Sequence, residues 1–345
     1  MPNSQITHEH DLVSIQEKVR FLQQPDSYPD KQNKIEAKET HMSWVFLGEE
    51  FVYKLKKPVR YDILNFSTIE ARRKNCEREV RLNRRLAEDV YLETLPLTMH
   101  ENGQLAMDGE GAIVDWLVKM RRLPLDRMLD AAILNNKVNS GDVTRFCRLL
   151  TNFYQHIAAP AAIEPDAYLY RFEQGISANH KDLCKTVYRM SLSQTQRLSD
   201  AQVRFIEEQG HLLKRRAKDG RIVEAHGDLR PEHICLMPEP VIIDCLEFDQ
   251  QLRTQDPLDE LAYLAMECER LGATLIGKRV LQHYFDATGD HPPEPLISFY
   301  KIYRACIRAK IALWHIDDDQ LNDHEKWRAQ AYQYLEVAER YMTKC

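Results

Sequence analysis

The sequence predicts an α+β protein with a small, strand-rich N-terminal part and a larger, mainly helical part after it. The chain has 345 residues, more than a typical small domain, which favours two lobes or domains. Short apolar runs of strand length fill residues 42–59 and 95–123, with one long helical pattern between them. From residue 124 onward helical periodicity prevails, broken by brief apolar runs near residue 234 and at 241–244.

The first elements each have a local signal. Residues 10–24 space apolar side chains at helical intervals, and two prolines then end the pattern. The runs MSWVFL and FVYKL predict a hairpin, because a Gly-Glu-Glu turn separates them. Thr68, with Ser67 as a rival, is the expected N-cap of a helix that runs to about residue 88.

The domain boundary follows from the next group of strands. Apolar runs at 95–99, 103–107 and 112–120 predict strands that return to the same sheet. An extended connector near 119–124 then precedes the helical part. We therefore expect an N-terminal lobe of residues 1–120 and a C-terminal lobe of residues 121–345.

Composition narrows the class of protein. The net charge is −6, whereas proteins that bind a nucleic-acid backbone are usually basic, and an acidic enzyme suits a neutral or cationic substrate somewhat better. None of the eight cysteines is spaced as C-x-x-C, which indicates reduced thiols in a cytoplasmic protein rather than a metal cluster. Neither a signal peptide nor an apolar stretch of membrane-spanning length is expected.

Two aspartates in the C-terminal part carry the clearest chemical signal. Residues 226–236 read HGDLRPEHICL and residues 241–249 read VIIDCLEFD, so that Asp228 lies in a loop and Asp244 ends an apolar run 16 positions later. Phosphoryl transfer needs one carboxylate to orient the acceptor hydroxyl and another to hold Mg²⁺ against the triphosphate. Glu247 and Asp249 either supplement such a metal site or lie in a solvated loop.

This pattern resembles the aminoglycoside phosphotransferase and choline kinase-like family, which shares the protein-kinase fold. The resemblance is closest to a bacterial group of predicted kinases, through the phrases ETHMSWVFL, VYKLKKPV, CEREVRLNRRLA and MRRLP. Many members of that group carry a further C-terminal P-loop domain, which we do not expect in this chain. The resemblance implies a small β-rich lobe with one long helix, a larger helical lobe, ATP and Mg²⁺ as cofactors, and Asp228 as catalytic base.

The same resemblance assigns the metal site and the support of the catalytic loop. Asp244 is the implied metal aspartate. His233 stands where the family usually has a metal-binding asparagine. Imidazole is a poor Mg²⁺ ligand, so either a second metal ion is held differently or activity is weak or absent. His226 is expected to shape the loop, and Asp259, in QDPLDELA, to brace it through backbone hydrogen bonds.

A kinase also needs a lysine on a strand and a glutamate on a helix to orient it. Lys54 follows the apolar run FVY, and Glu79, with Glu77 as a rival, lies beside the apolar stripe of the long helix. The usual glycine-rich phosphate loop is missing near residues 39–41. The hydroxyl groups of Thr40 and Ser43 are candidates to bind phosphate in place of the N–H groups of that loop. Backbone atoms of residues 119–123, with Met120 among them, are expected to contact adenine.

The sequence thus predicts an ATP- and Mg-dependent phosphotransferase for a small hydroxyl- or amino-bearing molecule. A catalytically weak or inactive kinase-like protein that binds nucleotide or has a regulatory role is the first alternative. A nucleic-acid-associated protein that uses the basic helix face 72–85 is the second, although an ordinary solvated face explains that pattern more simply. A protein kinase is disfavoured, because no A-P-E arrangement follows Asp244. The acceptor and the oligomeric state do not follow from the sequence.

Overall fold

The computed structural model describes residues 5–6, 12–30, 32–61, 64–317 and 323–345. They form two compact units, which we describe separately. The smaller unit contains the described residues up to Leu125 together with Val241–Gln250, and the larger unit contains Asp126–Pro240 and Gln251–Cys345. The segment 241–250 was predicted to lie in the C-terminal lobe. It belongs to the smaller unit because Val241 and Ile243 pack against an apolar cluster there.

The smaller unit is built on a six-stranded sheet with the order β2-β3-β4-β9-β7-β8. All pairs in this sheet are antiparallel, and the predicted hairpin is formed by β3 and β4. The elements of this part of the chain are β1 (Gln5–Ile6), α1 (Ile15–Leu22), η1 (Pro25–Ser27), β2 (Glu36–Glu39), β3 (Ser43–Leu47), β4 (Phe51–Lys56), β5 (Val59–Tyr61), β6 (Leu64–Asn65), α2 (Ile69–Asn83), β7 (Tyr91–Met99), β8 (Leu105–Met107), β9 (Ala112–Arg121) and β12 (Val241–Ile242).

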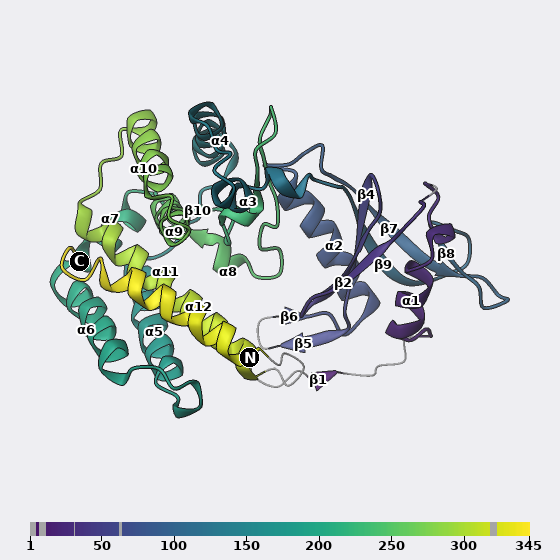
Figure 1. Ribbon diagram of the computed structural model, residues 1–345, viewed down its shortest axis with the longest axis horizontal. Helices are drawn as coiled ribbons and strands as arrows, with labels where there is room; N and C mark the ends of the chain where they lie inside the picture. The colour runs from purple at the N-terminus through teal and green to yellow at the C-terminus, as the bar shows by residue number, and fades with distance from the viewer. Residues whose placement is uncertain (1–4, 7–11, 31, 62–63, 318–322) are drawn as a thin grey trace. The chain divides into compact units, whose positions relative to one another are not determined.

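Two helices cover opposite faces of this sheet (Figure 1). Leu117 of β9 belongs to the apolar cluster that includes α1, whereas its neighbour Val118 belongs to the cluster that includes α2. Successive side chains of a strand point to opposite faces, so the alternation continues along β4. Tyr53 and Leu55 therefore lie on the α1 side, and the lysines on either side of Leu55 are directed toward α2.

The long helix begins where the sequence indicates. Thr68 is the N-cap, and its hydroxyl accepts a hydrogen bond from the Ala71 N–H at 3.1 Å. Cys76 and Val80 face the sheet and pack with Tyr91 and Val118. The helix ends at Asn83, about one turn earlier than predicted, and a turn then leads into β7.

The larger unit is mainly helical. Within the described residues, the sheet formed from its own strands is a single two-stranded pair of very short strands, β10 with β13. The elements are η2 (Leu125–Arg127), α3 (Leu129–Leu134), α4 (Ser140–Asn152), η3 (Phe153–Ile157), α5 (Pro165–Leu183), η4 (Thr186–Tyr188), α6 (Leu192–Gln209), α7 (His211–Lys218), β10 (Val223–Glu224), η5 (Pro231–His233), β11 (Ile234–Cys235), α8 (Gln250–Arg253), β13 (Thr254–Gln255), α9 (Pro257–Arg270), α10 (Thr274–Thr288), α11 (Glu294–Trp314), η6 (His315–Asp317) and α12 (His324–Glu339).

Helix α9 forms the centre of the larger unit. It packs against α10, α11, α12 and the short helix η5, and every residue from Pro257 to Glu269 is buried. Four of these buried residues are acidic, and a buried carboxylate is costly unless it is paired. Glu260 accepts hydrogen bonds from the backbone of a neighbouring loop, and the other three carboxylates pair with arginine or lysine side chains.

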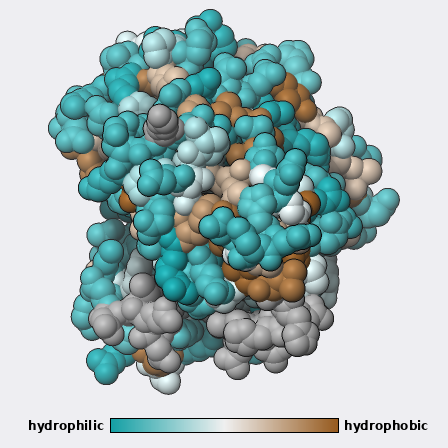
Figure 2. All heavy atoms as spheres, turned by 90° about the vertical axis from the view of Figure 1, so that its right-hand side faces the viewer, coloured by the Kyte–Doolittle hydropathy of each residue, from teal (hydrophilic) through white to brown (hydrophobic). Residues whose placement is uncertain are grey.

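The surface is largely hydrophilic on the face shown in Figure 2, where apolar side chains occur in separate patches. Among the helices of the described residues, none combines the length and the apolar character needed to cross a membrane.

Candidate functional site

The smaller unit pairs Lys54 with Glu79. The Lys54 Nζ atom lies 2.8 Å from Glu79 Oε1, and the Glu79 side chain is only 1% exposed. The rival Glu77 lies on the outer side of α2, where it pairs with Arg73. Burial alone lowers the pKa of Lys54, but the nearby Glu79, Asp244 and Glu247 carboxylates outweigh it and raise the pKa well above its usual value. Lys54 is therefore a fixed cation.

A second lysine completes this network, and sequence reasoning missed it. Lys56 lies two positions along β4, on the same face as Lys54, and its side chain is 1% exposed. Its Nζ atom lies 2.5 Å from Glu79 Oε2 and 2.7 Å from Glu247 Oε1. The signal was present in the sequence as the alternation Lys-Leu-Lys, which places both lysines on one side of the strand.

Asp244 lies next to Lys54, with 3.5 Å between its Oδ1 atom and the Lys54 Nζ atom. Its carboxylate is 51% exposed. Its backbone has a φ of 62°, in the left-handed region that non-glycine residues rarely adopt and that is enriched at functional sites. The Tyr91 hydroxyl accepts a hydrogen bond from the Asp244 N–H at 3.1 Å, which helps to hold this conformation.

The residues predicted to replace a glycine-rich phosphate loop are used differently. The Thr40 hydroxyl accepts from the Ser43 N–H at 3.0 Å and donates to the Ser43 carbonyl at 2.9 Å, closing the turn between β2 and β3. The Ser43 side chain is buried. One hydroxyl thus closes the turn and the other is buried, so their contact with phosphate stays a prediction.

The adenine contact predicted for Met120 is also not supported. Met120 lies within β9, opposite Val52 of β4 on one side and Tyr91 of β7 on the other. The N–H of the next residue, Arg121, already donates to the Val90 carbonyl at 2.8 Å. The backbone of Met120 is thus part of the sheet, and the chain leaves the sheet only after Arg121.

In the larger unit, Asp228 is held by two neighbours. Its Oδ2 atom accepts from Arg230 Nε at 3.0 Å, and its Oδ1 atom accepts from the Tyr263 hydroxyl at 3.1 Å. The side chain is 24% exposed. His226 is completely buried, and its Nδ1 atom accepts from the Asp228 N–H at 3.3 Å. The buried imidazole therefore contacts the backbone of the loop at Asp228.

His233 does not offer a metal-binding nitrogen, which corrects the prediction made for it. Its Nδ1 atom lies 2.8 Å from the Asp228 carbonyl oxygen, and its Nε2 atom lies 3.2 Å from Arg230 Nη2. A carbonyl only accepts and a guanidinium only donates, so Nδ1 carries the proton and the lone pair of Nε2 is used by Arg230. The imidazole thus fixes the loop on either side of Asp228.

The backbone of the loop is braced by Glu260 rather than by Asp259. Glu260 accepts from the Gly227 N–H at 2.6 Å and from the His226 N–H at 3.2 Å. Asp259 pairs instead with Arg304, at 2.6 Å. The prediction placed the brace one residue too early, because neighbouring positions of a helix point about 100° apart and only the second acid of this doublet faces the loop.

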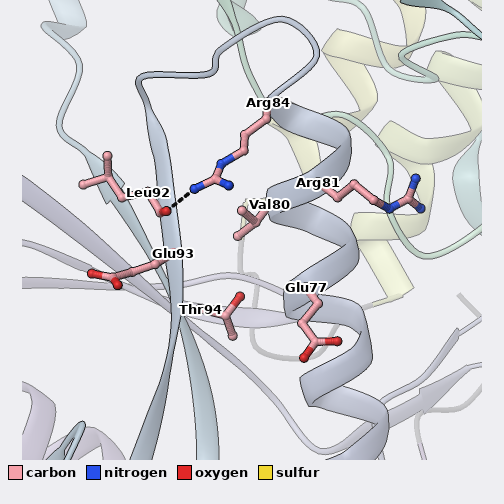
Figure 3. A pocket seen from close by; sticks show the side chains of 7 residues that line it. All are labelled: Glu77, Val80, Arg81, Arg84, Leu92, Glu93 and Thr94. Carbon is pink, nitrogen blue, oxygen red and sulfur yellow. Dashed lines mark hydrogen bonds between the residues drawn. The ribbon is translucent and has the colours of Figure 1, made fainter.

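The basic face of α2 is mostly engaged within the protein. Arg72 is fully buried and binds Asp115 at 2.8 Å, so it is not part of a solvated face. Arg84 donates to the Leu92 carbonyl, and between α2 and β7 lies a shallow pocket of mixed charge (Figure 3). The residues that line it are Glu77, Val80, Arg81, Arg84, Leu92, Glu93 and Thr94. Acidic side chains in this pocket disfavour a nucleic-acid backbone as its ligand.

The described part of the chain contains no group of three or more His, Cys, Asp or Glu side chains that could hold a metal by itself. Kinases bind Mg²⁺ through one or two carboxylates together with the phosphates of the nucleotide, so a complete protein cage is not required. The exposed oxygen ligand of Asp244, beside a lysine that can hold phosphate, fits such a site.

Two curated relatives, uncharacterized proteins of Mycobacterium tuberculosis and Mycobacterium bovis, are 32% identical to this chain over 282 residues. The matched region covers 80% of this chain and 54% of each relative, so the chain spans about half the length of these proteins. No protein-family model matches the sequence.

Solved structures of small-molecule kinases have the same architecture. A choline/ethanolamine kinase family protein from Mesorhizobium loti matches with a TM-score of 0.50 and 13% identity, covering 94% of this chain and 98% of that chain. The AMP-bound complex of a spectinomycin phosphotransferase matches with a TM-score of 0.53 and 11% identity, with the same two coverages. The chain has the fold of the aminoglycoside phosphotransferases and choline kinases. The predicted protein-kinase-like fold is therefore confirmed.

A further phosphotransferase structure extends this comparison. An aminoglycoside phosphotransferase in its complex with GDP and kanamycin matches with a TM-score of 0.53 and 13% identity, over 91% of this chain and 96% of that chain. Sequence reasoning did not single out four residues that hold the predicted lysine and the predicted catalytic loop in place in this structure. Those residues are Lys56, Arg230, Glu260 and Tyr263.

Proposed function

We propose that the protein is an ATP- and Mg-dependent phosphotransferase that acts on a small molecule with a hydroxyl group. The observation that carries the proposal is the arrangement of Lys54, Glu79 and Asp244, in which a buried carboxylate fixes a lysine beside an exposed aspartate. Catalysis of phosphoryl transfer consists mainly of positioning and charge stabilisation, and these residue types supply both.

Each residue has a defined role in this proposal. Lys54 holds phosphate oxygens of the nucleotide, and Glu79 keeps its ammonium group in place. Asp244 would hold Mg²⁺, which would supply positive charge next to the triphosphate. Asp228, whose carboxylate is held in place by Arg230 and Tyr263, orients the acceptor hydroxyl and takes its proton.

Thermal unfolding with ATP, in the presence and absence of Mg²⁺, tests the nucleotide site. A ligand at 100 times its Kd stabilises the folded state by about 2.7 kcal/mol, which shifts Tm by a few degrees. We expect a Mg²⁺-dependent shift in the wild type that is lost in Asp244→Ala. Asp89→Ala, which removes an exposed carboxylate of the same unit, is the control and keeps the shift.

The same experiment separates the alternative function. An inactive nucleotide-binding protein gives the Mg²⁺-dependent shift but no release of ADP with any acceptor. Absence of a shift in the wild type contradicts the nucleotide site itself.

A further inference from the structure

Two arginines of the larger unit are held side by side around one buried glutamate. Arg270 Nε donates to Glu267 Oε2 at 2.8 Å, and Arg308 Nε lies 3.6 Å from Glu267 Oε1. Tyr334 donates to the same Glu267 oxygen at 2.8 Å, and both guanidinium groups lie near its ring, at 5.1 and 5.7 Å from the centroid. The Glu267 side chain is 0% exposed, so this arrangement is fixed from inside the protein.

The outer ends of these arginines have no hydrogen-bond partner among the residues that the structure describes. Both are bound through Nε, and over the described residues no acceptor meets the Nη atoms of Arg270 or Arg308. Their side chains are 17% and 16% exposed, so water or a ligand can reach them. Arg230 differs, because its guanidinium is engaged by Asp228, Glu232 and His233. Of these three arginines, Arg270 and Arg308 are therefore the two whose Nη atoms can bind an external anion.

Helix geometry places this pair beside the candidate catalytic loop. Tyr263, which donates to Asp228, lies one turn before Glu267 on the same face of α9. Arg304 of α11 lies 5.5 Å from the Tyr263 ring, and Arg308 follows one turn later. Burial lowers the pKa of Arg308, but the combined effect of Tyr263, Tyr334 and Asp228 outweighs burial and raises this pKa. Asp228 is therefore close to Arg308. At about 1.5 Å per residue, Glu267, which holds the two arginines, lies roughly 6 Å along α9 from Tyr263.

We propose that Arg270 and Arg308 bind an anionic group, a carboxylate or a phosphate, on the acceptor whose hydroxyl Asp228 orients. This inference rests on the proposed function and specifies its substrate class. Planar guanidinium groups with parallel N–H donors suit these anions. It also replaces the expectation, drawn from the net charge of −6, that the substrate is neutral or cationic, because local charge at a site outweighs whole-chain charge.

Anion binding can be measured on the whole 345-residue chain without nucleotide. The probe is inorganic phosphate, followed by ³¹P line broadening in wild type, Arg270→Gln, Arg308→Gln and the control Arg148→Gln, which removes an exposed arginine of α4. We expect each of the first two variants to weaken binding roughly tenfold to a hundredfold, and the control to leave it unchanged. In both variants Glu267 keeps two partners, and thermal unfolding verifies that they fold. Equal phosphate affinity in all four proteins overturns the proposal.

Turnover then distinguishes the acceptor from the nucleotide as the source of the anion. ADP release is measured with matched hydroxyl compounds that are anionic, neutral or cationic: glucose 6-phosphate and gluconate, glucose, and glucosamine. We expect activity in the anionic class, and Arg308→Gln to raise KM for that acceptor with little change in KM for ATP. Activity confined to cationic compounds, or a change in KM for ATP alone, overturns the acceptor assignment. Arginine-dependent phosphate binding without turnover of any compound supports the anion site and counts against the proposed function instead.

Discussion

Lys56 binds Glu247 at 2.7 Å across 191 positions of the sequence. The same ammonium group binds Glu79, which in turn holds Lys54. One buried cation therefore joins the strand that carries Lys54 to the segment that carries Asp244. Because Lys56 is 1% exposed and Lys54 is 18% exposed, the two lysines are expected to contribute differently to stability and to function.

Replacing Lys56 with methionine is expected to destabilise the smaller unit strongly. The change leaves the Glu79 and Glu247 carboxylates without their shared cation, and removing one partner of a buried ion pair costs about 3–5 kcal/mol. Urea unfolding measures this loss. Lys54→Met is the matched comparison on the same strand, and we expect it to cost less stability but to abolish nucleotide binding. Equal stability of both variants and the wild type contradicts the assigned role of Lys56.

Glu79 and Glu77 provide a second matched pair. Glu79→Gln removes the negative charge that positions Lys54. We expect ATP affinity to fall roughly tenfold, because a charge-assisted hydrogen bond is lost. Glu77→Gln removes an exposed partner of Arg73 and is expected to leave ATP affinity unchanged. Isothermal titration with Mg-ATP gives both values. A larger loss in Glu77→Gln than in Glu79→Gln reverses the assignment.

Features that depend on interactions between residues close in the sequence could be predicted from the sequence. The hairpin, the N-cap at Thr68 and the helical character of the C-terminal part depend on local patterns, and the structure agrees with them. The choice of Glu79 over Glu77 followed from one apolar stripe, since only Glu79 lies beside it. These features need no knowledge of distant contacts.

The remaining features depend on contacts between distant segments. Glu260 rather than Asp259 meets the loop because of how α9 is rotated against it, which the acidic doublet alone does not specify. The use of both His233 nitrogens depends on Arg230 and on the Asp228 carbonyl, all within one loop whose shape has no periodic signal. Segment 241–250 belongs to the smaller unit because it packs with α2. Its position in the sequence alone predicts that it lies in the C-terminal lobe.

The acid stability of the larger unit is expected to depend on Asp290. Burial alone raises the pKa of this carboxyl, but hydrogen bonds from Arg216 and Tyr284 and the charge of Arg221 outweigh it and hold the pKa below its usual value. A carboxyl with a lowered pKa in the folded state stabilises the protein above its unfolded pKa of about 3.9, and this stability is lost as the pH falls through the folded pKa.

Urea midpoints of wild type and Asp290→Asn between about pH 6 and about pH 3 test this dependence. We expect the wild type to be more stable at the upper end of this range and the difference to shrink toward the lower end. Asp256 keeps Arg216 paired in the variant, at 2.6 Å, so the variant is expected to fold. A difference that stays constant over the whole range shows that Asp290 does not titrate as described.

Variants of Asp228 and Tyr263 test two roles separately: accepting the proton and orienting the carboxylate that accepts it. Asp228→Asn removes the base while preserving size, and we expect turnover to fall by roughly 10²–10⁴ while Mg-ATP binding is retained. Tyr263→Phe removes only the hydrogen bond to Asp228 Oδ1, so Arg230 still holds the other oxygen and a smaller loss is expected. Steady-state turnover with an acceptor, together with the thermal shift by Mg-ATP, measures both variants. Unchanged turnover in Asp228→Asn rules out its role as base, and a larger loss in Tyr263→Phe assigns the proton transfer to the tyrosine.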